Sequence, residues 1–373
     1  MKYTFLLFLL PLFSLANDGA FRASGNQLIP ITETDISVKK EILTIRRINK
    51  KQTRVEVYYE FFNPKEAKTI EVGFEAVSPS GDADHYPTKD GHQPYINEFT
   101  VTLNDASIPY KVAIVHDKIY YRNGQYKAIS LAQANKESEE EYVDFVYVYH
   151  FRASFKQGLN IIRHSYVVDL SNSVTERYSL EYVLTAAKRW ANKQIDDFTL
   201  QIDMGEFQDL CIHQTFFKNA AEWKTDSTVK SLDERSAEKD QPGMSRFFIR
   251  KGMIVFTKMN FKPRGELNMQ SFNIYHYRIV ERSDGAGQPE QFDSRTTRLP
   301  FAIEDQDDIF PPVDELSKKI LHNLPFARRG YVFKSPGIAA YYKKQPWYLP
   351  DPAYTPDPGS LTKQEQDWLA KNK

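Results

Sequence analysis

Apolar side chains recur at every second position through most of this chain, and this period limits the fold more than any other feature. In residues 55–62 (VEVYYEFF), one face carries Val55, Val57, Tyr59 and Phe61, and the turn pair Asn-Pro follows at 63–64. Period two is the pattern of a strand with one buried face. The same pattern marks residues 70–74, 99–103, 110–114, 143–151, 162–168, 178–184, 198–202, 247–249, 254–256 and 272–276. We therefore expect a mainly β protein.

Turn residues and polar stretches divide these strands into two groups. Several short strands separated by turns are typical of a β-sandwich. We predict one sandwich-like domain at residues 17–125 and a second at 140–285, separated by a polar stretch that ends in the glutamates of residues 137–141. Residues 286–311 follow a Gly-rich break and include the acidic stretch EDQDD at 304–308, and we interpret them as a linker.

The hydrophobic period changes after Pro312. Val313, Leu316, Ile320 and Leu324 recur at three- and four-residue steps, which predicts an amphipathic helix beginning near Pro312. Pro325 is expected to kink or restart this helix, and the residues Arg-Arg-Gly at 328–330 are a helix-ending sequence. Residues 361–365 (LTKQE) form a capping box, so a last helix is expected to begin there and to dock through Trp368.

The first 16 residues have the organisation of a secretory signal peptide. Lys2 precedes an apolar stretch, and Ser14-Leu15-Ala16 places small residues at the positions a signal peptidase inspects, so we expect cleavage before Asn17. The alternative is a buried core strand. No later segment approaches 18 consecutive apolar residues, so we expect no membrane span and a periplasmic or extracellular location.

Charge and cysteine content exclude several classes of function. The chain of 373 residues carries 49 Lys and Arg against 49 Asp and Glu, which gives no basic footprint for nucleic acid. Cys211 is the single cysteine, so an intrachain disulfide, a cysteine-ligated zinc site and an iron–sulfur cluster are all excluded. We predict no cofactor.

The C-terminal residues resemble the YARHG domain, a small module of exported bacterial proteins. The resemblance covers about the last 60 residues, which we define as a module at 312–373, and it carries no catalytic residues over to this chain. Phe326 and Arg329 stand where the family name has Tyr and His. The matching elements are residues 326–333 (FARRGYVF), Tyr341-Tyr342, Trp347-Tyr348, Leu361-Thr362 and Glu365.

The preceding part resembles, more weakly, an uncharacterised family of exported bacterial β domains. This second resemblance implies an architecture and no activity. It rests on residues 59–64 (YEFFNP), 94–99 (PYINEF) and 182–184 (YVL), together with Trp190 and 195–198 (IDDF).

Aromatic and basic side chains alternate in the C-terminal module. From residue 310 onward there are ten Lys and Arg against six Asp and Glu. Exposed rings stack on sugars or peptides, and cations suit anionic envelope polymers. The predicted binding residues are Arg328, Arg329, Tyr331, Trp347 and Tyr348. The alternative is that these rings form the core of a small module and that the arginines cap the helix or pair with the acidic stretch at 304–308.

No catalytic or metal motif is present. The loop Asp82–His92 contains three aspartates and two histidines, but its spacing fits neither an EF-hand nor a zinc signature, so we predict a solvated loop and no metal site.

We therefore predict a non-enzymatic binding or scaffold protein of the bacterial cell envelope, whose C-terminal module contacts a wall or protein partner. One alternative is a glycan or peptide hydrolase using His164, Asp169 or that loop. Another is a purely architectural protein.

Overall fold

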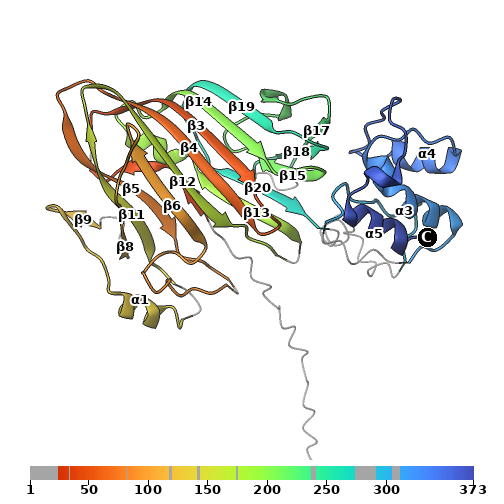
Figure 1. The fold of residues 1–373 in the computed structure, drawn as a ribbon, viewed down its shortest axis with the longest axis horizontal. Helices are drawn as coiled ribbons and strands as arrows, with labels where there is room; N and C mark the ends of the chain where they lie inside the picture. The colour runs from red at the N-terminus through yellow and green to blue at the C-terminus, as the bar shows by residue number, and fades with distance from the viewer. Residues whose placement is uncertain are drawn as a thin grey trace, which may run out of the picture.

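The computed structural model describes residues 24–32, 34–81, 83–116, 120–140, 143–173, 175–236, 241–273, 291–304 and 311–373. A β-rich body extends to residue 273, and the helical C-terminal module lies at one end of it (Figure 1). The predicted mainly β fold with a helical C-terminal module is confirmed. The predicted signal peptide at 1–16 lies outside the described residues.

An eight-stranded sheet forms one layer of the body. Its strands are β3 (Ser37–Arg47), β4 (Gln52–Asn63), β6 (Ile96–Leu103), β7 (Ala106–Ser107), β12 (Gly158–Asp169), β14 (Ile195–Asp203), β16 (Trp223–Lys224) and β19 (Ile254–Phe261). They lie in the order β16-β19-β14-β3-β4-β12-β6-β7. β14 and β3 pair in parallel, and the other neighbours pair antiparallel.

Two smaller sheets contribute the remaining long strands. The six-stranded sheet contains β1 (Ser24–Asn26), β13 (Glu176–Val183), β20 (Leu267–Phe272), β15 (Gln208–His213), β18 (Met244–Ile249) and β17 (Val229–Glu234), in that order. The four-stranded sheet contains β2 (Leu28–Pro30), β5 (Lys68–Val77), β11 (Val146–Phe155) and β8 (Lys111–Val115), in that order. Short elements complete the body: β9 (Tyr121–Arg122), β10 (Gln125–Tyr126), α1 (Leu131–Glu137), η1 (Thr185–Arg189) and η2 (Ala220–Glu222).

Both smaller sheets pack on the same face of the large sheet. Phe74 of β5 lies 5.0 Å, ring to ring, from Tyr166 of β12, and Phe247 of β18 lies 5.5 Å from Trp223 of β16. One hydrophobic cluster contains residues of all three sheets. The alternation at 55–61 is confirmed, since the four predicted inward side chains of β4 are each at most 2% exposed.

Two titratable side chains are enclosed in this core. Glu41 on β3 accepts hydrogen bonds from the Gln27 amide nitrogen at 2.8 and 2.7 Å, and burial raises its pKa to about 8. His164 on β12 stacks between the rings of Tyr59 and Tyr166, and burial lowers its pKa to about 3. Each is 2% exposed or less, so both are held in their uncharged forms near neutral pH.

Strands from both predicted sandwich-like domains pair in common sheets. In the large sheet, β3, β4, β6 and β7 come from the first range, 17–125, and β12, β14, β16 and β19 from the second, 140–285. Alternation shows which side chains share a face, but it does not show which strand lies alongside. The domain boundaries inferred from the sequence stay predictions.

The C-terminal module is built from α3 (Glu315–Arg328), α4 (Pro336–Lys343), η3 (Pro358–Ser360) and α5 (Lys363–Lys371). α3 continues through Pro325, although a proline there removes the N–H that would bond the carbonyl of Leu321. The indole nitrogen of Trp368 on α5 donates to that carbonyl at 2.7 Å instead. The predicted docking of Trp368 is confirmed, and it supplies the hydrogen bond that the proline removes.

α3 ends in the motif that its sequence indicates. Gly330 has a φ of +94°, its N–H bonds the carbonyl of Ala327 at 2.9 Å, and the N–H of Tyr331 bonds that of Phe326 at 3.0 Å. This pair of bonds is the Schellman arrangement, which satisfies two carbonyls at the helix end. A Cβ at Gly330 would lie 2.7 Å from the carbonyl oxygen of Leu349, so the chain also passes too close for a side chain.

Candidate functional site

The C-terminal module and the body share a hydrophobic core at their junction. Phe207 and Phe248 of the body belong to the same cluster as the helices of the module. Residues 291–304, which fall within the predicted linker, add four buried side chains to this cluster. These are Phe292, Leu299, Phe301 and Ile303. The predicted binding residues therefore belong to a packed junction or lie next to it.

Glu304 ties this segment to two strands of the body. Its carboxylate accepts hydrogen bonds from Arg47 at 3.0 Å and from Arg177 at 2.9 Å, and both guanidiniums are buried, with side chains 8% and 2% exposed. Arg47 ends β3, and Arg177 lies in β13, so one carboxylate links the large sheet, the six-stranded sheet and the segment before the module. The rest of the acidic stretch, residues 305–308, lies outside the described residues.

Arg328 and Arg329 converge on one buried carboxylate. Glu365 of α5 is 1% exposed and accepts from Arg328 at 3.3 Å and from Arg329 at 2.5 Å. Glu365 also completes the predicted capping box, because its carboxylate accepts the N–H of Thr362 at 3.0 Å. The capping box is confirmed, and its glutamate additionally holds α5 against the end of α3.

Both guanidiniums also lie over an aromatic ring of the body. The carbon centres of Arg328 and Arg329 are 4.5 and 4.6 Å from the ring centroid of Phe207. Arg328 is 4% exposed, and burial lowers its pKa to about 10 even though Glu365 opposes this shift. Such contacts orient the module on the body. Sequence reasoning missed Glu365 as the arginine partner, since a separation of 36 and 37 residues carries no signal of contact.

The predicted aromatic residues divide into an inner and an outer group. Trp347 is 3% exposed, and its indole nitrogen donates to the carbonyl of Leu299 at 2.9 Å, which places it in the core. Tyr331 and Tyr348 are half-buried, and the hydroxyl of Tyr348 donates to the carbonyl of Tyr331 at 2.7 Å. Phe333 packs against Tyr331 at 4.9 Å and continues the ring cluster inward. The two outer tyrosines are therefore joined by a hydrogen bond, and packed aromatic rings lie behind them.

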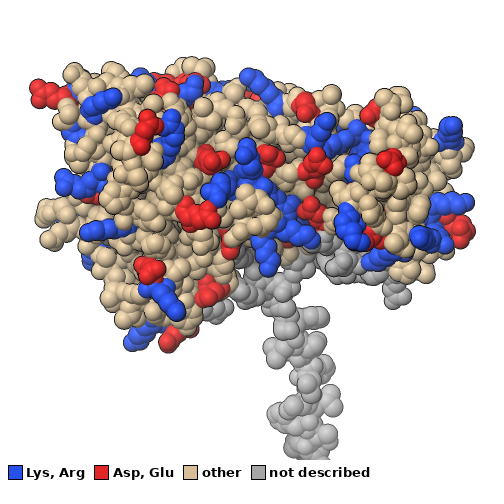
Figure 2. All heavy atoms as spheres, viewed as in Figure 1, with Lys and Arg blue, Asp and Glu red and all other residues tan. Residues whose placement is uncertain are grey.

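Two cations of the body border these tyrosines. Lys230 of β17 donates to the carbonyl of Tyr348 at 3.1 Å, and Arg250, just after β18, donates to that of Leu349. Val332, between the ring residues, is 46% exposed. We name the surface formed by Tyr331, Val332 and Tyr348 the tyrosine face. On the face of the molecule shown in Figure 2, acidic and basic side chains are interspersed.

The loop Asp82–His92 has a local structure that its own side chains stabilise. His85 contacts the carbonyl of Gly81 at 2.9 Å, and the N–H of Asp84 bonds the hydroxyl of Tyr95 at 2.9 Å. Asp82 itself lies outside the described residues. Within the described parts of the chain, no group of three or more metal-ligating side chains is found.

Two residues named for the hydrolase alternative, His164 and Asp169, lie on opposite faces of one strand. His164 and Asp169 lie five positions apart on β12, so they project to opposite faces. His164 is enclosed between sheets, whereas Asp169 accepts from the amide of Gln52 at 2.9 Å. Cys211 is buried, and burial raises the pKa of its thiol, which is typical of an inert cysteine.

Comparison with known families decides the nature of the C-terminal module. Residues 312–373 match the YARHG domain. The YARHG module of this chain thus places its motif arginine, Arg328, against Glu365, together with Arg329, which stands at the position of the motif histidine. Its motif glycine, Gly330, lies at a helix end. No curated protein matches the chain. Among the described residues, no helix has both the length and the apolarity to cross a membrane.

Three solved structures resemble the chain at low sequence identity. A candidate nutrient-binding protein from Legionella pneumophila is 17% identical with a TM-score of 0.48, and the match covers 96% of this chain and 100% of that one. An M1 zinc metallopeptidase from Deinococcus radiodurans is 8% identical with a TM-score of 0.22, over 63% of this chain and 42% of that one. Baculovirus P35 is 11% identical with a TM-score of 0.23, over 66% of this chain and 98% of that one.

Proposed function

We propose that this protein is a non-enzymatic binding protein of the bacterial cell envelope, and that its YARHG module contacts a wall or protein partner through the tyrosine face. The observation that carries the proposal is the hydrogen bond of 2.7 Å from the Tyr348 hydroxyl to the main-chain carbonyl of Tyr331, which fixes the Tyr348 ring beside the backbone of Tyr331, while both tyrosines stay partly exposed. Rigid aromatic side chains with a polar tip are typical contact residues, because they lose little conformational entropy on binding.

The surroundings of the tyrosine face support binding of an acceptor-rich partner. Lys230 and Arg250 lie beside Tyr348, and Lys334 is exposed three residues after Tyr331. Cations beside exposed rings favour carboxylates, phosphates and carbonyls of a partner. Arg328 and Trp347, which are buried, and Arg329, which is half-buried, contribute indirectly, since they hold the module in place behind these residues.

We also propose that residues 1–16 direct export and that the mature chain begins at Asn17. Export would place the protein in the periplasm or outside the cell, as in other proteins that carry this module. The test is the mass of the N-terminal peptide recovered from periplasmic and culture fractions. A chain that keeps Met1 and remains in the cytoplasm would refute this part of the proposal.

The binding test uses point variants of the full chain. Removing the whole module would expose Phe207 and Phe248 and so disturb the body. Tyr331→Ser removes an outer ring, and Tyr86→Ser is the matched control, because Tyr86 is 45% exposed on a loop of the body. The readouts are co-sedimentation with purified peptidoglycan sacculi and cross-linking to envelope proteins in cells.

We expect Tyr331→Ser to lower the bound fraction in one of these assays and Tyr86→Ser to leave it unchanged. A decrease with sacculi identifies a wall partner, and a decrease in cross-linking identifies a protein partner. An unchanged bound fraction for Tyr331→Ser in both assays would exclude the tyrosine face as the contact surface.

A further inference from the structure

A groove of about 280 Å³ lies on the outer face of the large sheet, opposite the face on which the smaller sheets pack. It crosses four neighbouring strands, which are β3, β4, β12 and β6 (Figure 1). Three interstrand spacings give the groove a length of about 14 Å. Every residue of these four strands is described, so the chemistry of the lining is known in full.

Two parallel rows of side chains form the two sides of the groove. In strand register, the first row consists of Ile42, Tyr58, Arg163 and Thr102. The second row consists of Thr44, Glu56, Ser165 and Thr100. The rows are two residues apart on each strand, so both project from the same face of the sheet. The main chain at Val57 and His164, whose buried side chains point into the core, forms the floor between the rows.

The long side chains of the first row are fixed by contacts on its far side. The hydroxyl of Tyr58 donates to Glu60 at 2.9 Å. The guanidinium of Arg163 lies over the Tyr58 ring, 5.2 Å from its centroid, and pairs with Asp105 at 2.6 Å. Because Glu60 follows Tyr58 along β4 and Glu56 precedes it, the hydroxyl of Tyr58 is directed away from the second row. The contacts that keep the groove open are therefore already formed without a ligand.

The lining also holds polar groups that can bind a ligand. The hydroxyls of Thr100 and Ser165 bond each other at 2.9 Å, which leaves one O–H of the pair as a donor. Thr102 and the exposed Glu56 form no side-chain hydrogen bond or ion pair with any residue that the structure describes. The groove thus offers hydroxyls that donate and accept, and one carboxylate that accepts.

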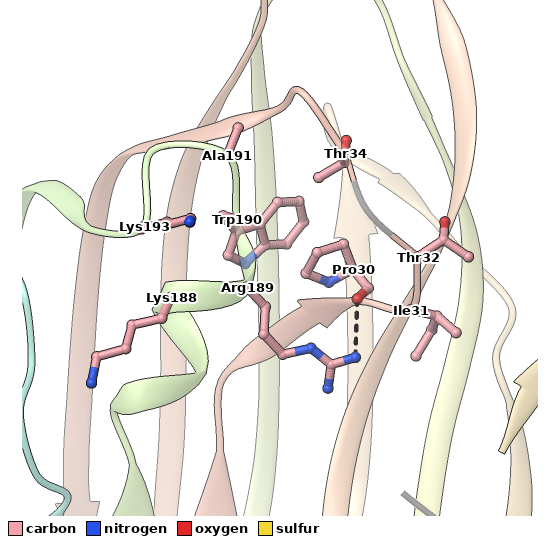
Figure 3. Close-up of a pocket in the computed structure, with 9 residues that line it drawn as sticks. All are labelled: Pro30, Ile31, Thr32, Thr34, Lys188, Arg189, Trp190, Ala191 and Lys193. Carbon is pink, nitrogen blue, oxygen red and sulfur yellow. Dashed lines mark hydrogen bonds between the residues drawn. The ribbon is translucent and has the colours of Figure 1, made fainter. Parts of the chain in front are cut away.

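The core supports the floor of the groove from behind. The ring of Phe61 in β4 lies 4.4 Å from that of the buried Trp190. Beside Trp190, Arg189 donates to the carbonyl of Pro30 at 3.4 Å, which ties η1 to the end of β2 (Figure 3). The large sheet is therefore held against the four-stranded sheet, and the strands below the groove are fixed in place.

The charge of the groove disfavours an anionic ligand, and its floor disfavours a peptide. Arg163 is neutralised by Asp105, whereas no described cation pairs with Glu56. The floor lies in β4 and β12, and each of these strands pairs with a neighbour on both sides. Their N–H and C=O groups are used within the sheet, so an extended peptide would find no main-chain partner. A neutral sugar needs neither a cation nor a free strand edge, because its hydroxyls bond side chains directly.

We infer that this groove binds a neutral saccharide chain. Glu56 accepts hydrogen bonds from adjacent sugar hydroxyls, and the hydroxyl of Thr102 and the Thr100–Ser165 pair bond the others from the two sides. Ile42 and the Tyr58 ring contact the apolar C–H groups of a sugar ring. This site shares no residue with the tyrosine face, so each of the two proposals can fail without the other.

Isothermal titration calorimetry of the mature chain (residues 17–373) tests the inference. The neutral probes are triacetylchitotriose, cellotriose and maltotriose, and trigalacturonate is an anionic probe of the same length. We expect at least one neutral probe to bind with a Kd of about 1 mM or lower, and trigalacturonate to bind more weakly. If no neutral probe gives heat at about 10 mM, the inference is wrong. Binding of trigalacturonate at least as tight as that of the best neutral probe, or binding of tetra-alanine alone, would also overturn it.

Variants on the two sides of the groove locate the binding. We expect the Kd of the bound trisaccharide to rise by about ten-fold in Glu56→Gln and by about three-fold in Thr102→Val, because each change removes a hydrogen-bonding group. Thr257→Val is the matched control and should change Kd by less than about two-fold, since Thr257 is an exposed threonine on the same face in β19, beyond the groove. An unchanged Kd in both Glu56→Gln and Thr102→Val would place the saccharide elsewhere and overturn the inference.

A second readout separates lost contacts from lost folding. Glu56→Gln removes the negative charge of the groove, so it should narrow the difference in Kd between trigalacturonate and the neutral probe. A misfolded variant would lose both probes together and would show a lower melting temperature. If Glu56→Gln weakens both probes equally while its melting temperature is unchanged, Glu56 does not face the ligand and the inference fails.

Discussion

The buried carboxyl of Glu41 makes a quantitative prediction about stability. Glu41 is 1% exposed between the sheets, its oxygens accept from the Gln27 amide, and no described basic side chain forms an ion pair with it. Burial raises its pKa from 4.5 to about 8. The folded protein therefore holds a proton on Glu41 at pH 7 that the unfolded chain has released. The substitution Glu41→Gln removes this difference while keeping the shape and a hydrogen-bonding amide.

The size of the stability change follows from the pKa of Glu41 in the folded and the unfolded state. Because the folded pKa is raised, the contribution of Glu41 to stability is intact below pH 4.5 and is lost as pH rises towards about 8. Each pKa unit corresponds to about 1.4 kcal/mol, so the loss is about 3 kcal/mol at pH 7 and approaches about 5 kcal/mol above pH 8. Between about pH 5.5 and 8.5 the stability of Glu41→Gln should therefore rise by about 3 kcal/mol relative to that of the parent.

The shifted pKa of His164 makes stability change with pH in the opposite direction. Its pKa is lowered from 6.5 to about 3, so its contribution is intact above pH 6.5 and is lost as pH falls towards about 3. The pH dependences that these two groups contribute to stability cancel between pH 4.5 and 6.5. The histidine is present in both proteins, so it does not affect the comparison of Glu41→Gln with the parent.

The assay is urea unfolding followed by tryptophan fluorescence at several pH values. Glu56→Gln, an exposed glutamate on the neighbouring strand β4, is the matched control and should show a pH-independent difference from the parent. If the difference between Glu41→Gln and the parent is the same at about pH 5.5 and 8.5, Glu41 is not held protonated in the core and the reasoning fails.

Three further substitutions test the YARHG module, each read by the free energy of unfolding. Glu365→Gln leaves two arginines without their carboxylate and should cost about 3 kcal/mol or more; a cost below about 1 kcal/mol would show that the pairing contributes little. Trp368→Phe removes the donor to the carbonyl of Leu321 and should cost about 2 kcal/mol, and adding Pro325→Ala should recover part of this cost by restoring the helical N–H; an additive or larger loss in the double variant would contradict that. Gly330→Ala should cost more than about 1 kcal/mol, because φ is positive and a Cβ would meet backbone; a neutral effect would be inconsistent with the Schellman end.

Local features of this fold were predictable from the sequence because they depend on neighbouring residues. The alternation at 55–61 identified the buried face of β4, and the spacing of Thr362 and Glu365 identified the start of α5. Their physical causes act over two to four positions, so they are visible in a short window.

Features that depend on distant residues were not predictable. The parallel pairing of β14 with β3 joins residues about 157 positions apart, and alternation carries no information on it. The carboxylate that pairs with Arg328 and Arg329 could not be predicted for the same reason, because Glu365 lies 36 and 37 residues away in the sequence.

The bond between Glu304 and the two arginines of the body has a mechanical consequence. Arg47 and Arg177 lie in different sheets, and both bind Glu304. These two contacts restrict the motion of the module relative to the body. The segment that leads into the module is therefore held on the large sheet and on the six-stranded sheet at once. A partner that contacts the module would thereby be held in a fixed orientation relative to the body.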